Sequence, residues 1–292
     1  MKTSRVRLGL VMATILLVGG TDHANAHAIA GQRLFPSTLT FDDPGIGAEF
    51  PLVFSRIRAD GVYQNDLSLS VTKPITPGFS LIAGTDYLGI SQPGAATTHG
   101  WGNISVGGVW QVYRNADSES IGSFSISDNI ARTGSHAMRD EYSTWSPEFD
   151  FGKGFGNAPA AWMKPFAVSG ALGLDLPTDP RAPRMLDWGT SLQYNIAYLQ
   201  DFVKYVGIKA PFDKMIPIVE FPMQTCLDRG CRGQTTGYVS PGLIWIGHYL
   251  QAGFELQVPV NRRSGHSVGI LFGVDLYLDD LAPHGFGAPL FH

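Results

Sequence analysis

The sequence predicts an all-β protein: a transmembrane, antiparallel, up-and-down β-barrel of about twelve strands. Three observations lead to this prediction. The chain begins with an export signal, and the rest of it repeatedly alternates apolar residues with small polar ones. Only 16% of its 292 residues are charged, whereas soluble domains carry about 25%. Such strands would present one face to lipid and the other to a polar interior.

The first 26 residues read as a cleaved signal peptide. Lys2, Arg5 and Arg7 precede an apolar run, Leu8–Gly20, and a small-residue cleavage motif ends at Ala26. The run is too short for a spanning helix. No later segment is apolar for long enough to span a membrane as a helix, so a mature protein that crosses a membrane must do so with strands. The sequence therefore predicts export to the outer membrane of a Gram-negative bacterium.

Alternation with a period of two residues is clearest near the end of the chain. Val268, Ile270 and Phe272 share one side of a strand there, and Gly269 and Asp275 lie on the other. Several such runs exceed the roughly 9–11 residues that a tilted strand needs to cross a bilayer. By the same pattern, strands are expected near residues 48–57, 61–72, 78–90, 101–114, 120–131, 145–156, 162–176, 187–201, 214–224, 235–247, 249–262 and 267–280.

A membrane barrel explains this pattern because lipid hydrates no backbone group and a closed sheet leaves no unpaired edge. The alternative is a soluble β-sandwich or lipocalin-like barrel with its apolar face inward. A soluble protein would carry more charge on its outer face, and the polar faces here are mostly Gly, Ser, Asn and Gln. The membrane barrel is therefore favoured.

Connection lengths give a second indication of how the strands lie. The outer connections, 91–100, 132–144, 177–186 and 225–234, are expected to be longer than the inner ones. The segment 202–213 is the exception, and it indicates either a short periplasmic helix or an error in the strand count. Aromatic residues near strand ends are typical of interfacial girdles, and they are Trp101, Trp145, Trp162, Trp188, Tyr198 and Tyr249.

The chain divides into four expected parts. Residues 1–26 form the signal peptide, 27–47 a polar periplasmic lead-in or a plug, 48–280 the outer-membrane barrel, and 281–292 a tail rich in Pro and Gly. The choice between lead-in and plug stays open, because the segment shows no strand or helix periodicity.

Cys226 and Cys231 are the only cysteines, and they lie in one predicted outer loop. In an exported protein such a pair predicts a disulfide. Free thiols are the first alternative. A metal or redox site is the second, and it is disfavoured because no partner ligands lie nearby in the sequence.

Polar residues on the predicted inner faces are the candidate functional residues. The carboxylates among them either make a mildly acidic lumen that favours neutral or cationic solutes, or pair internally and hold the barrel's shape. The lumen-facing candidates are Asp66, Asn103, Glu148, Asp150, Asp175, Gln193, Asn195, Glu220, Glu255 and Asp275.

The sequence offers no recognisable catalytic, cofactor or metal motif. Ser135-His136 and Gly265-His266-Ser267 supply residue types for a rim hydrolase but no known pattern. His27 could chelate copper if cleavage made it the mature N-terminus. A formal net charge of −4 argues against nucleic acid as a partner. The expected partners are outer-membrane lipid, a small-molecule solute and, during biogenesis, the barrel-assembly machinery.

Three segments of the last third carry a family resemblance: Ile216–Phe221, Tyr238–Leu243 and Gln257–Asn261. Over roughly residues 160–280 the chain resembles the outer-membrane β-barrel family named for the MetA/meta-cleavage pathway of phenol degradation, whose members are described as transporters. The resemblance implies a barrel that passes small, often aromatic, compounds, and it supplies no catalytic residues.

The function expected from the sequence is therefore a passive channel or transporter for small molecules, which the resemblance suggests are hydrophobic or aromatic. The first alternative is a barrel filled by its own side chains and the 27–47 segment, with a structural or adhesive role. An outer-membrane enzyme and a soluble periplasmic β-protein are weaker alternatives.

Overall fold

The computed structural model describes residues 28–59 and 61–291. The expected signal peptide, residues 1–26, lies outside the described residues. No helix in the described ranges is long and apolar enough to cross a membrane.

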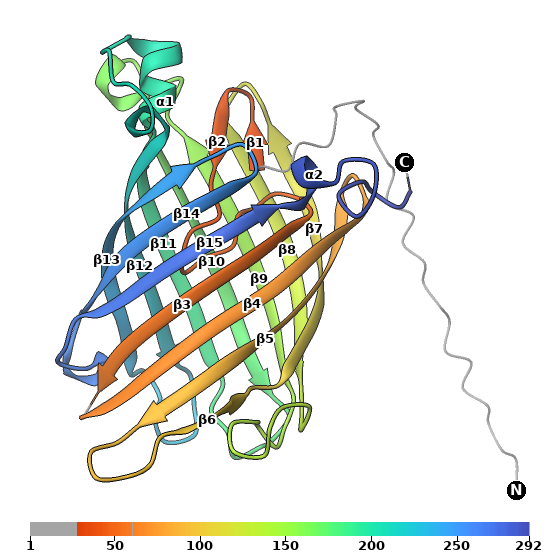
Figure 1. Ribbon diagram of the computed structural model, residues 1–292, viewed down its shortest axis with the longest axis vertical. Coiled ribbons are helices and arrows are strands. Elements are labelled where there is room, and N and C mark those ends of the chain that lie inside the picture. Colours follow the sequence, from red (N-terminus) through yellow and green to blue (C-terminus); the bar gives the residue numbers. More distant parts are fainter. Residues whose placement is uncertain (1–27, 60, 292) are drawn as a thin grey trace, which may run out of the picture.

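Twelve long antiparallel strands form one closed barrel (Figure 1). Each strand pairs with its neighbour in the chain, and β15 pairs with β3 to close the sheet. The predicted up-and-down barrel is thus confirmed. The strands are β3 (Glu49–Ala59), β4 (Val62–Thr76), β5 (Phe79–Ser91), β7 (Ile104–Asn115), β8 (Ser120–Ile130), β9 (Thr144–Gly154), β10 (Phe166–Pro177), β11 (Met185–Tyr194), β12 (Met215–Cys226), β13 (Thr235–Ile246), β14 (Leu250–Pro259) and β15 (Gly269–Tyr277). A short strand, β6 (Thr98–Trp101), prolongs the pairing of β5.

The largest departure from the predicted strands follows β11. The expected strand 187–201 ends at Tyr194, and the chain turns into α1 (Ile196–Tyr198) and a π-helical turn, Leu199–Val203. Asn195 ends the strand because its side chain accepts a hydrogen bond from the Tyr198 backbone N–H at 2.9 Å, as a helix N-cap does. The segment 202–213, expected to be either a short helix or an error in the strand count, thus follows helical turns that begin earlier, at Ile196, and it runs into a 3-10 turn, Phe212–Lys214.

Two other strands are shorter than expected at the same end of the barrel. The range 162–176 begins as a 3-10 turn, Ala161–Met163, before β10. The range 267–280 ends at Tyr277 and continues as α2 (Leu278–Leu281). In both places the expected strand range includes residues that do not pair with a neighbouring strand in the structure.

Large apolar side chains cover the outside of the barrel. Phe54 lies opposite Phe272 on β15 and opposite Leu67 on β4, and directly opposed residues share a face of the sheet. Phe272 is half exposed, whereas its neighbours on the other face are buried. An exposed apolar belt of this extent is what contact with acyl chains requires.

The inner face of the barrel is polar, and many of its polar side chains are buried. Ser80, Ser123, Ser169, Ser191 and Ser240 all lie there with little or no exposed surface. The protein is therefore apolar outside and polar inside, the reverse of a soluble barrel. This is the arrangement that the alternating pattern predicts.

The two ends of the barrel differ. The described chain enters and leaves the barrel at one end, which we call the terminal end (Figure 1). At the opposite end, the loop end, the connections include 131–143, 178–184 and 227–234. The connections of the terminal end are mostly short, and 195–214 is the long exception.

The expected aromatic girdle is present with one exception. Trp101, Trp145, Trp188 and Tyr249 are exposed near strand ends, and Trp162 is exposed just before β10. Tyr198, the sixth residue predicted for the girdle, is buried. Because α1 replaces the end of the expected strand, this ring turns inward.

Candidate functional site

The N-terminal segment, residues 28–47, lies inside the barrel. It begins with a hairpin at the terminal end, formed by β1 (Ala28–Ala30) and β2 (Arg33–Phe35), and then passes along the lumen wall. The Thr40 hydroxyl donates a hydrogen bond to Glu220 Oε2 at 2.6 Å. Gln251 Nε2 donates to the Ser37 carbonyl oxygen, also at 2.6 Å. The segment is thus bonded to β12 and β14 from within.

Glycines on the inner face of the wall make room for this segment. A Cβ atom on Gly273 would lie 2.3 Å from Leu39 Cδ2, and one on Gly189 would lie 2.3 Å from Phe41 Cζ. Leu39 and Phe41 therefore occupy space that any larger wall residue would take. This fit between segment and wall indicates that the segment belongs to the folded barrel.

A buried arginine fastens the hairpin to the terminal end. Arg33 has no exposed surface, and its Nε lies 3.2 Å from Glu119 Oε2. Its guanidinium also donates to the Pro165 carbonyl oxygen at 3.1 Å and lies 3.6 Å from the centre of the Tyr198 ring. A buried charge needs partners of this kind, since an unpaired one is costly.

Tyr198 and Glu119 complete this cluster. The Tyr198 hydroxyl donates to Glu119 Oε1 at 2.7 Å, and the Gly156 backbone N–H donates to Glu119 Oε2 at 3.0 Å. Burial and the hydrogen bond to Glu119 raise the pKa of Tyr198 to about 12, so the phenol keeps its proton and remains a donor. Four segments of the terminal end thus meet at one carboxylate: the hairpin, the β7–β8 turn, the β9–β10 connection and α1.

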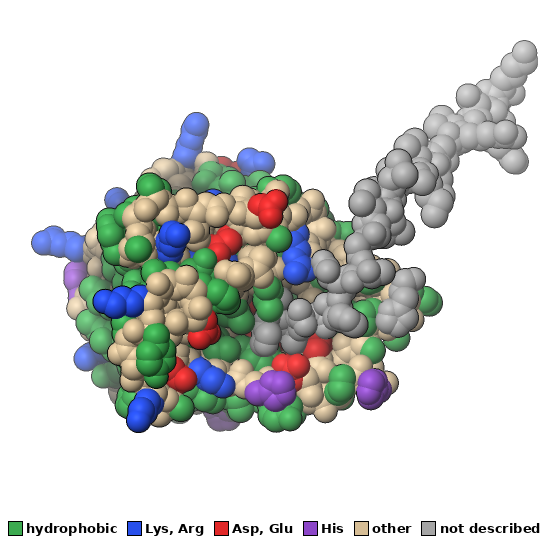
Figure 2. All heavy atoms as spheres, turned by 90° about the horizontal axis from the view of Figure 1, so that it is seen from above, with side chains coloured by type: hydrophobic (Ala, Val, Ile, Leu, Met, Phe, Trp, Pro, Cys, Tyr) green, Lys and Arg blue, Asp and Glu red, His purple; other side chains and the backbone are tan. Residues whose placement is uncertain are grey.

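The segment leaves a narrow gap along the opposite wall. A cavity of about 40 Å³ lies between it and β3, β4, β5, β7, β8 and β9. Its lining includes Asp42, Asp43, Glu49 and Asp150, together with serines and threonines. The Asp42 side chain is exposed although the barrel encloses it, so water reaches it from the lumen. In the end view, acidic side chains lie within the wall and basic ones lie mostly at its periphery (Figure 2).

The lumen carries charge of one sign. Away from the strand ends, the inner-face positions of the twelve described strands hold carboxylates and no lysine or arginine, whereas Arg114, at the terminal end of β7, lies opposite the buried Ile121. Arg33, a basic residue of the inner segment, lies at the terminal end, where Glu119 balances its charge. Carboxylates lined up in a passage with low-dielectric walls attract cations and repel anions.

Most of the predicted lumen residues lie on the inner face. Asp66 lies opposite Ser55, Glu148 opposite Ser125, and Asp175 accepts a hydrogen bond from the Ser146 hydroxyl at 2.6 Å. Asp150 and Asp275 are almost fully buried. Gln193 donates to Ser169 and Ser191 at 2.8 and 3.0 Å, in a small network of side chains.

Glu220 and Glu255 form a buried carboxylate pair. Both have no exposed surface, and their side chains interact with each other. They lie on β12 and β14, and Gly242 on the intervening β13 leaves the space that the Glu255 side chain occupies. The register of the sheet brings these two carboxylates together, and the sequence alone does not specify that register.

Two predicted residues lie outside the lumen proper. Asn103 lies at the loop end, where its side chain donates to the Asp140 carbonyl oxygen at 3.1 Å and accepts from the Gly134 N–H at 3.2 Å. Asn195 is the N-cap of α1 at the terminal end. The side chain of each forms hydrogen bonds within a connection between strands, so neither side chain lines the lumen.

The sequence interpretation missed several residues of the site. Asp42 and Asp43 come from the segment without periodicity, and nothing in the sequence indicates that they face the passage. Asp187 and Glu49 could have been found, because each is in the same alternating phase as inner-face residues of its strand. Arg33 could not, since its partners are distant in the sequence.

The structure does not gather the residues once considered for catalysis. The Ser135 hydroxyl donates to the Trp101 carbonyl oxygen at 2.9 Å, which fixes the 131–143 loop. Within residues 28–59 and 61–291, no group of three or more His, Cys, Asp or Glu side chains could hold a metal ion.

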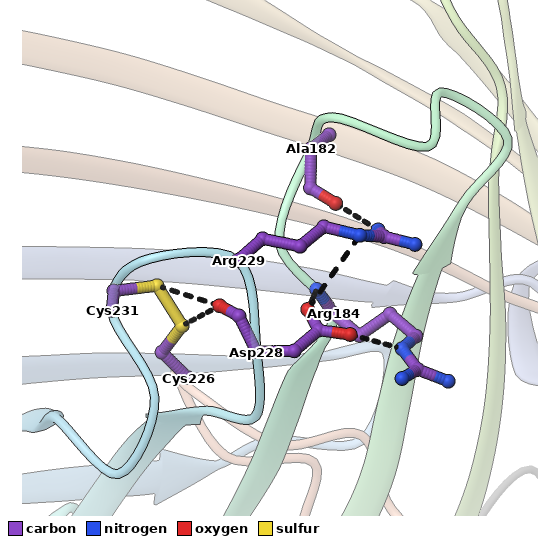
Figure 3. Close-up of a disulfide and its surroundings, with 6 residues drawn as sticks. All are labelled: Ala182, Arg184, Cys226, Asp228, Arg229 and Cys231. Atoms are coloured by element: carbon purple, nitrogen blue, oxygen red, sulfur yellow. Dashed lines mark hydrogen bonds and ion pairs between the residues drawn. A yellow bond between two sulfur atoms is a disulfide. The ribbon is translucent and has the colours of Figure 1, made fainter.

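Cys226 and Cys231 form a disulfide, as predicted (Figure 3). It closes the loop after β12, which is tied to the neighbouring 178–184 loop. Asp228 Oδ2 lies 2.7 Å from Arg184 Nε, and Arg229 donates to the Ala182 carbonyl oxygen. The Arg184 backbone and side-chain N–H groups lower the pKa of Asp228 and keep it ionised.

Replacing both cysteines, Cys226→Ser and Cys231→Ser, is expected to loosen this loop and leave the barrel folded. Closing so short a loop stabilises a fold by about 2 kcal/mol in the chain-entropy estimate, and the barrel pairs many more residues elsewhere. Limited proteolysis should cut the variant faster within 227–233. The wild type treated with a reductant serves as the matched control. Loss of the compact, unboiled band on a gel would contradict the expectation.

Comparison with known proteins supports the fold. No protein-family model matches the chain, and no curated protein matches it. The crystal structure of an outer membrane channel from Pseudomonas putida F1 aligns with a TM-score of 0.56 at 12% identity, over 88% of this chain and 99% of that one. The KdgM porin (TM-score 0.44, 11% identity) and the NanC porin (0.46, 8%) each cover 78% of this chain and 98% of their own. These likenesses concern the fold.

Proposed function

We propose that this protein is a passive outer-membrane channel for small neutral or cationic molecules. One observation carries the proposal: a cavity of about 40 Å³, lined by carboxylates and hydroxyls, lies beside the inner segment. The apolar outer belt supports a location in a bilayer, and the polar inner face would then offer a hydrated route across it.

The proposed mechanism is diffusion with two filters. The first filter is size, because the cavity that the inner segment leaves beside the wall measures about 40 Å³, close to the volume that one or two water molecules occupy. The second filter is charge, because Asp42, Asp43 and Glu49 face the gap together. A solute larger than an ion would require the segment to move.

The aromatic solutes implied by the family resemblance would fit another place. A cavity of about 260 Å³ lies at the terminal end between the hairpin and the α1 region. Leu34, Phe202, Ile216 and Ile246 give it apolar walls, and Tyr198 adds a polar group. A compound with one aromatic ring and a hydroxyl group matches this lining of apolar and polar side chains. The cavity at the terminal end is therefore the favoured binding site for such a solute.

Conductance of the purified protein in a planar bilayer tests the proposal. We expect small, steady conductance steps and, in a potassium chloride gradient, a reversal potential of the sign that marks preference for potassium. The heat-dependent shift of the unboiled band on a gel serves as the control for folding. Absence of conductance from protein that passes this control would contradict a channel.

A filled, non-conducting barrel with a structural role is the second candidate. The small size of the gap beside the inner segment favours it. It predicts no conductance in the wild type at any voltage and no uptake of small solutes by proteoliposomes. The channel proposal predicts passage of small cations, and swelling of proteoliposomes in small sugars or amines only where the segment moves aside.

A further inference from the structure

The described lysines and most of the described arginines lie at opposite ends of the barrel, and Arg33 and Arg114 are the arginines at the terminal end. The six described lysines all belong to the terminal end, and they are Lys73, Lys153, Lys164, Lys204, Lys209 and Lys214. Ten arginines belong to the loop end, and they are Arg56, Arg58, Arg132, Arg139, Arg181, Arg184, Arg229, Arg232, Arg262 and Arg263. Arginine differs from lysine in matching phosphate with two parallel hydrogen bonds.

Four of these arginines gather on one sector of the wall, and we call them the arginine cluster: Arg56, Arg58, Arg262 and Arg263. Arg56 and Arg58 end the β3 strand, and Arg262 and Arg263 follow β14 directly. In the sheet, β3, β15 and β14 are consecutive neighbours. The cluster therefore spans three adjacent strand ends.

The cluster side chains on β3 point away from the lumen. Arg56 lies opposite Ile270 on β15, and Ile270 is on the exposed face that alternates with buried Leu271. Arg58 lies opposite Tyr63 on β4, two residues further along the same face. Both guanidinium groups contact the Tyr63 ring, at 4.8 and 4.9 Å from its centre, so one ring helps to position both of them.

The cluster lacks acidic partners that its neighbours have. At the same end, Arg181 lies 2.8 Å from Asp179, Arg184 lies 2.7 Å from Asp228, and Arg132 lies 2.8 Å from Glu141. Among the described residues, no carboxylate forms an ion pair with any of the four cluster arginines, all of which are exposed. Asp60, in the β3–β4 turn, lies outside the described residues.

An apolar strip leads from the cluster toward the middle of the wall. Val260 and Val268 are exposed beside the cluster, and Ile270, Phe272 and Phe54 continue the strip. Along β3, consecutive outward-facing residues change from the apolar Phe54 to the charged Arg56. The boundary between hydrocarbon and water is therefore expected to run through this sector.

We propose that the arginine cluster binds the phosphate groups of a phosphorylated membrane lipid. The lipid's acyl chains lie along the apolar strip of β14, β15 and β3. Its phosphates accept hydrogen bonds from Arg56 and Arg58 on one side and from Arg262 and Arg263 on the other. Free phosphate would contact only the arginines and would leave the apolar strip uncovered. The continuity of basic and apolar parts commits the site to a lipid, and the partial removal of water at the boundary strengthens each ion pair.

Lipid binding to the purified protein tests this site. Native mass spectrometry counts the lipids retained by detergent-solubilised protein after incubation with lipid A, which carries phosphates and acyl chains, or with its dephosphorylated form. The variant R56Q/R58Q/R262Q/R263Q is compared with the wild type. We expect the wild type to retain lipid A selectively and the variant to bind it at least about tenfold more weakly.

A matched control removes the same charge from the opposite end. The variant K164Q/K204Q/K209Q/K214Q should retain lipid A as the wild type does. Both variants must first show the shifted, unboiled band of a folded barrel. Equal binding by the cluster variant and the wild type would overturn the proposal. So would equal retention of the dephosphorylated lipid, or displacement of lipid A by millimolar inorganic phosphate, which would indicate a site for a free anion.

Discussion

Deleting residues 28–47 is expected to raise the single-channel conductance several-fold, which we consider the largest effect that any change in this protein would have. The segment lies inside the barrel, and it is bonded to the wall at Glu220 and Gln251. Its removal would leave a twelve-strand barrel, wide enough for water once nothing occupies it. Planar-bilayer recordings measure the change, and the heat-dependent gel shift shows whether the barrel closes without the segment.

Adding one methyl group to the inner wall, at Gly273, should displace the segment without deleting it. A Cβ on Gly273 would lie 2.3 Å from Leu39 Cδ2, whereas its next neighbours, Val53 Cγ2 and Leu52 O, are at 3.5 and 3.6 Å. Gly273→Ala therefore collides with the segment and spares the wall. We expect it to displace the segment and increase conductance. Adding Leu39→Ala should return the conductance toward the wild-type value.

Gly78→Ala is the control for this series, because a Cβ there meets nothing within 4 Å. If Gly273→Ala conducts like the wild type, and Leu39→Ala changes nothing in either background, the segment does not lie against β15 in the bilayer. The deletion and the methyl substitution would then disagree, and the conductance of the deletion variant would reflect a changed barrel.

The strands could be predicted from the sequence because lipid imposes a simple rule on each of them separately. Phe54, Leu67 and Phe272 lie outward, as their alternation indicates, whatever their neighbours are. The rule fails where the membrane ends. Asn195 and Tyr198 continue the alternation in the sequence, yet a side-chain cap by Asn195 and the contacts of Tyr198 with Glu119 and Arg33 decide their structure.

The candidate site was harder to predict because it depends on contacts between distant residues. Asp150 could be assigned to the inner face from its strand alone. The pairing of Glu220 with Glu255 depends on how far β12 and β14 are staggered, and no local pattern encodes that. The place of the inner segment depends on cavities left by Gly189 and Gly273, which in the sequence look like ordinary small inward residues.

Neutralising the carboxylates of the passage is expected to abolish its preference for cations. The variant D42N/D43N/E49Q keeps the size of each side chain, and an asparagine at position 43 can still accept the hydrogen bond that Asp43 Oδ1 takes from the Gly45 N–H at 2.7 Å. With the three carboxylates of a narrow gap replaced by neutral amides, the reversal potential in a potassium chloride gradient should move close to zero. The single-channel conductance should fall as well, because fewer cations enter.

Salt concentration and a matched control decide whether charge alone is responsible. Charges are screened over about 10 Å at 0.1 M salt and over about 3 Å at 1 M, so the wild type and the variant should differ most at low salt and converge at high salt. Glu141→Gln removes a carboxylate from a loop-end ion pair with Arg132 and should leave the reversal potential unchanged. An unchanged reversal potential in the triple variant would place the selectivity elsewhere. Asp66 and Glu148, which also lie on the inner wall, would then be the next pair to neutralise.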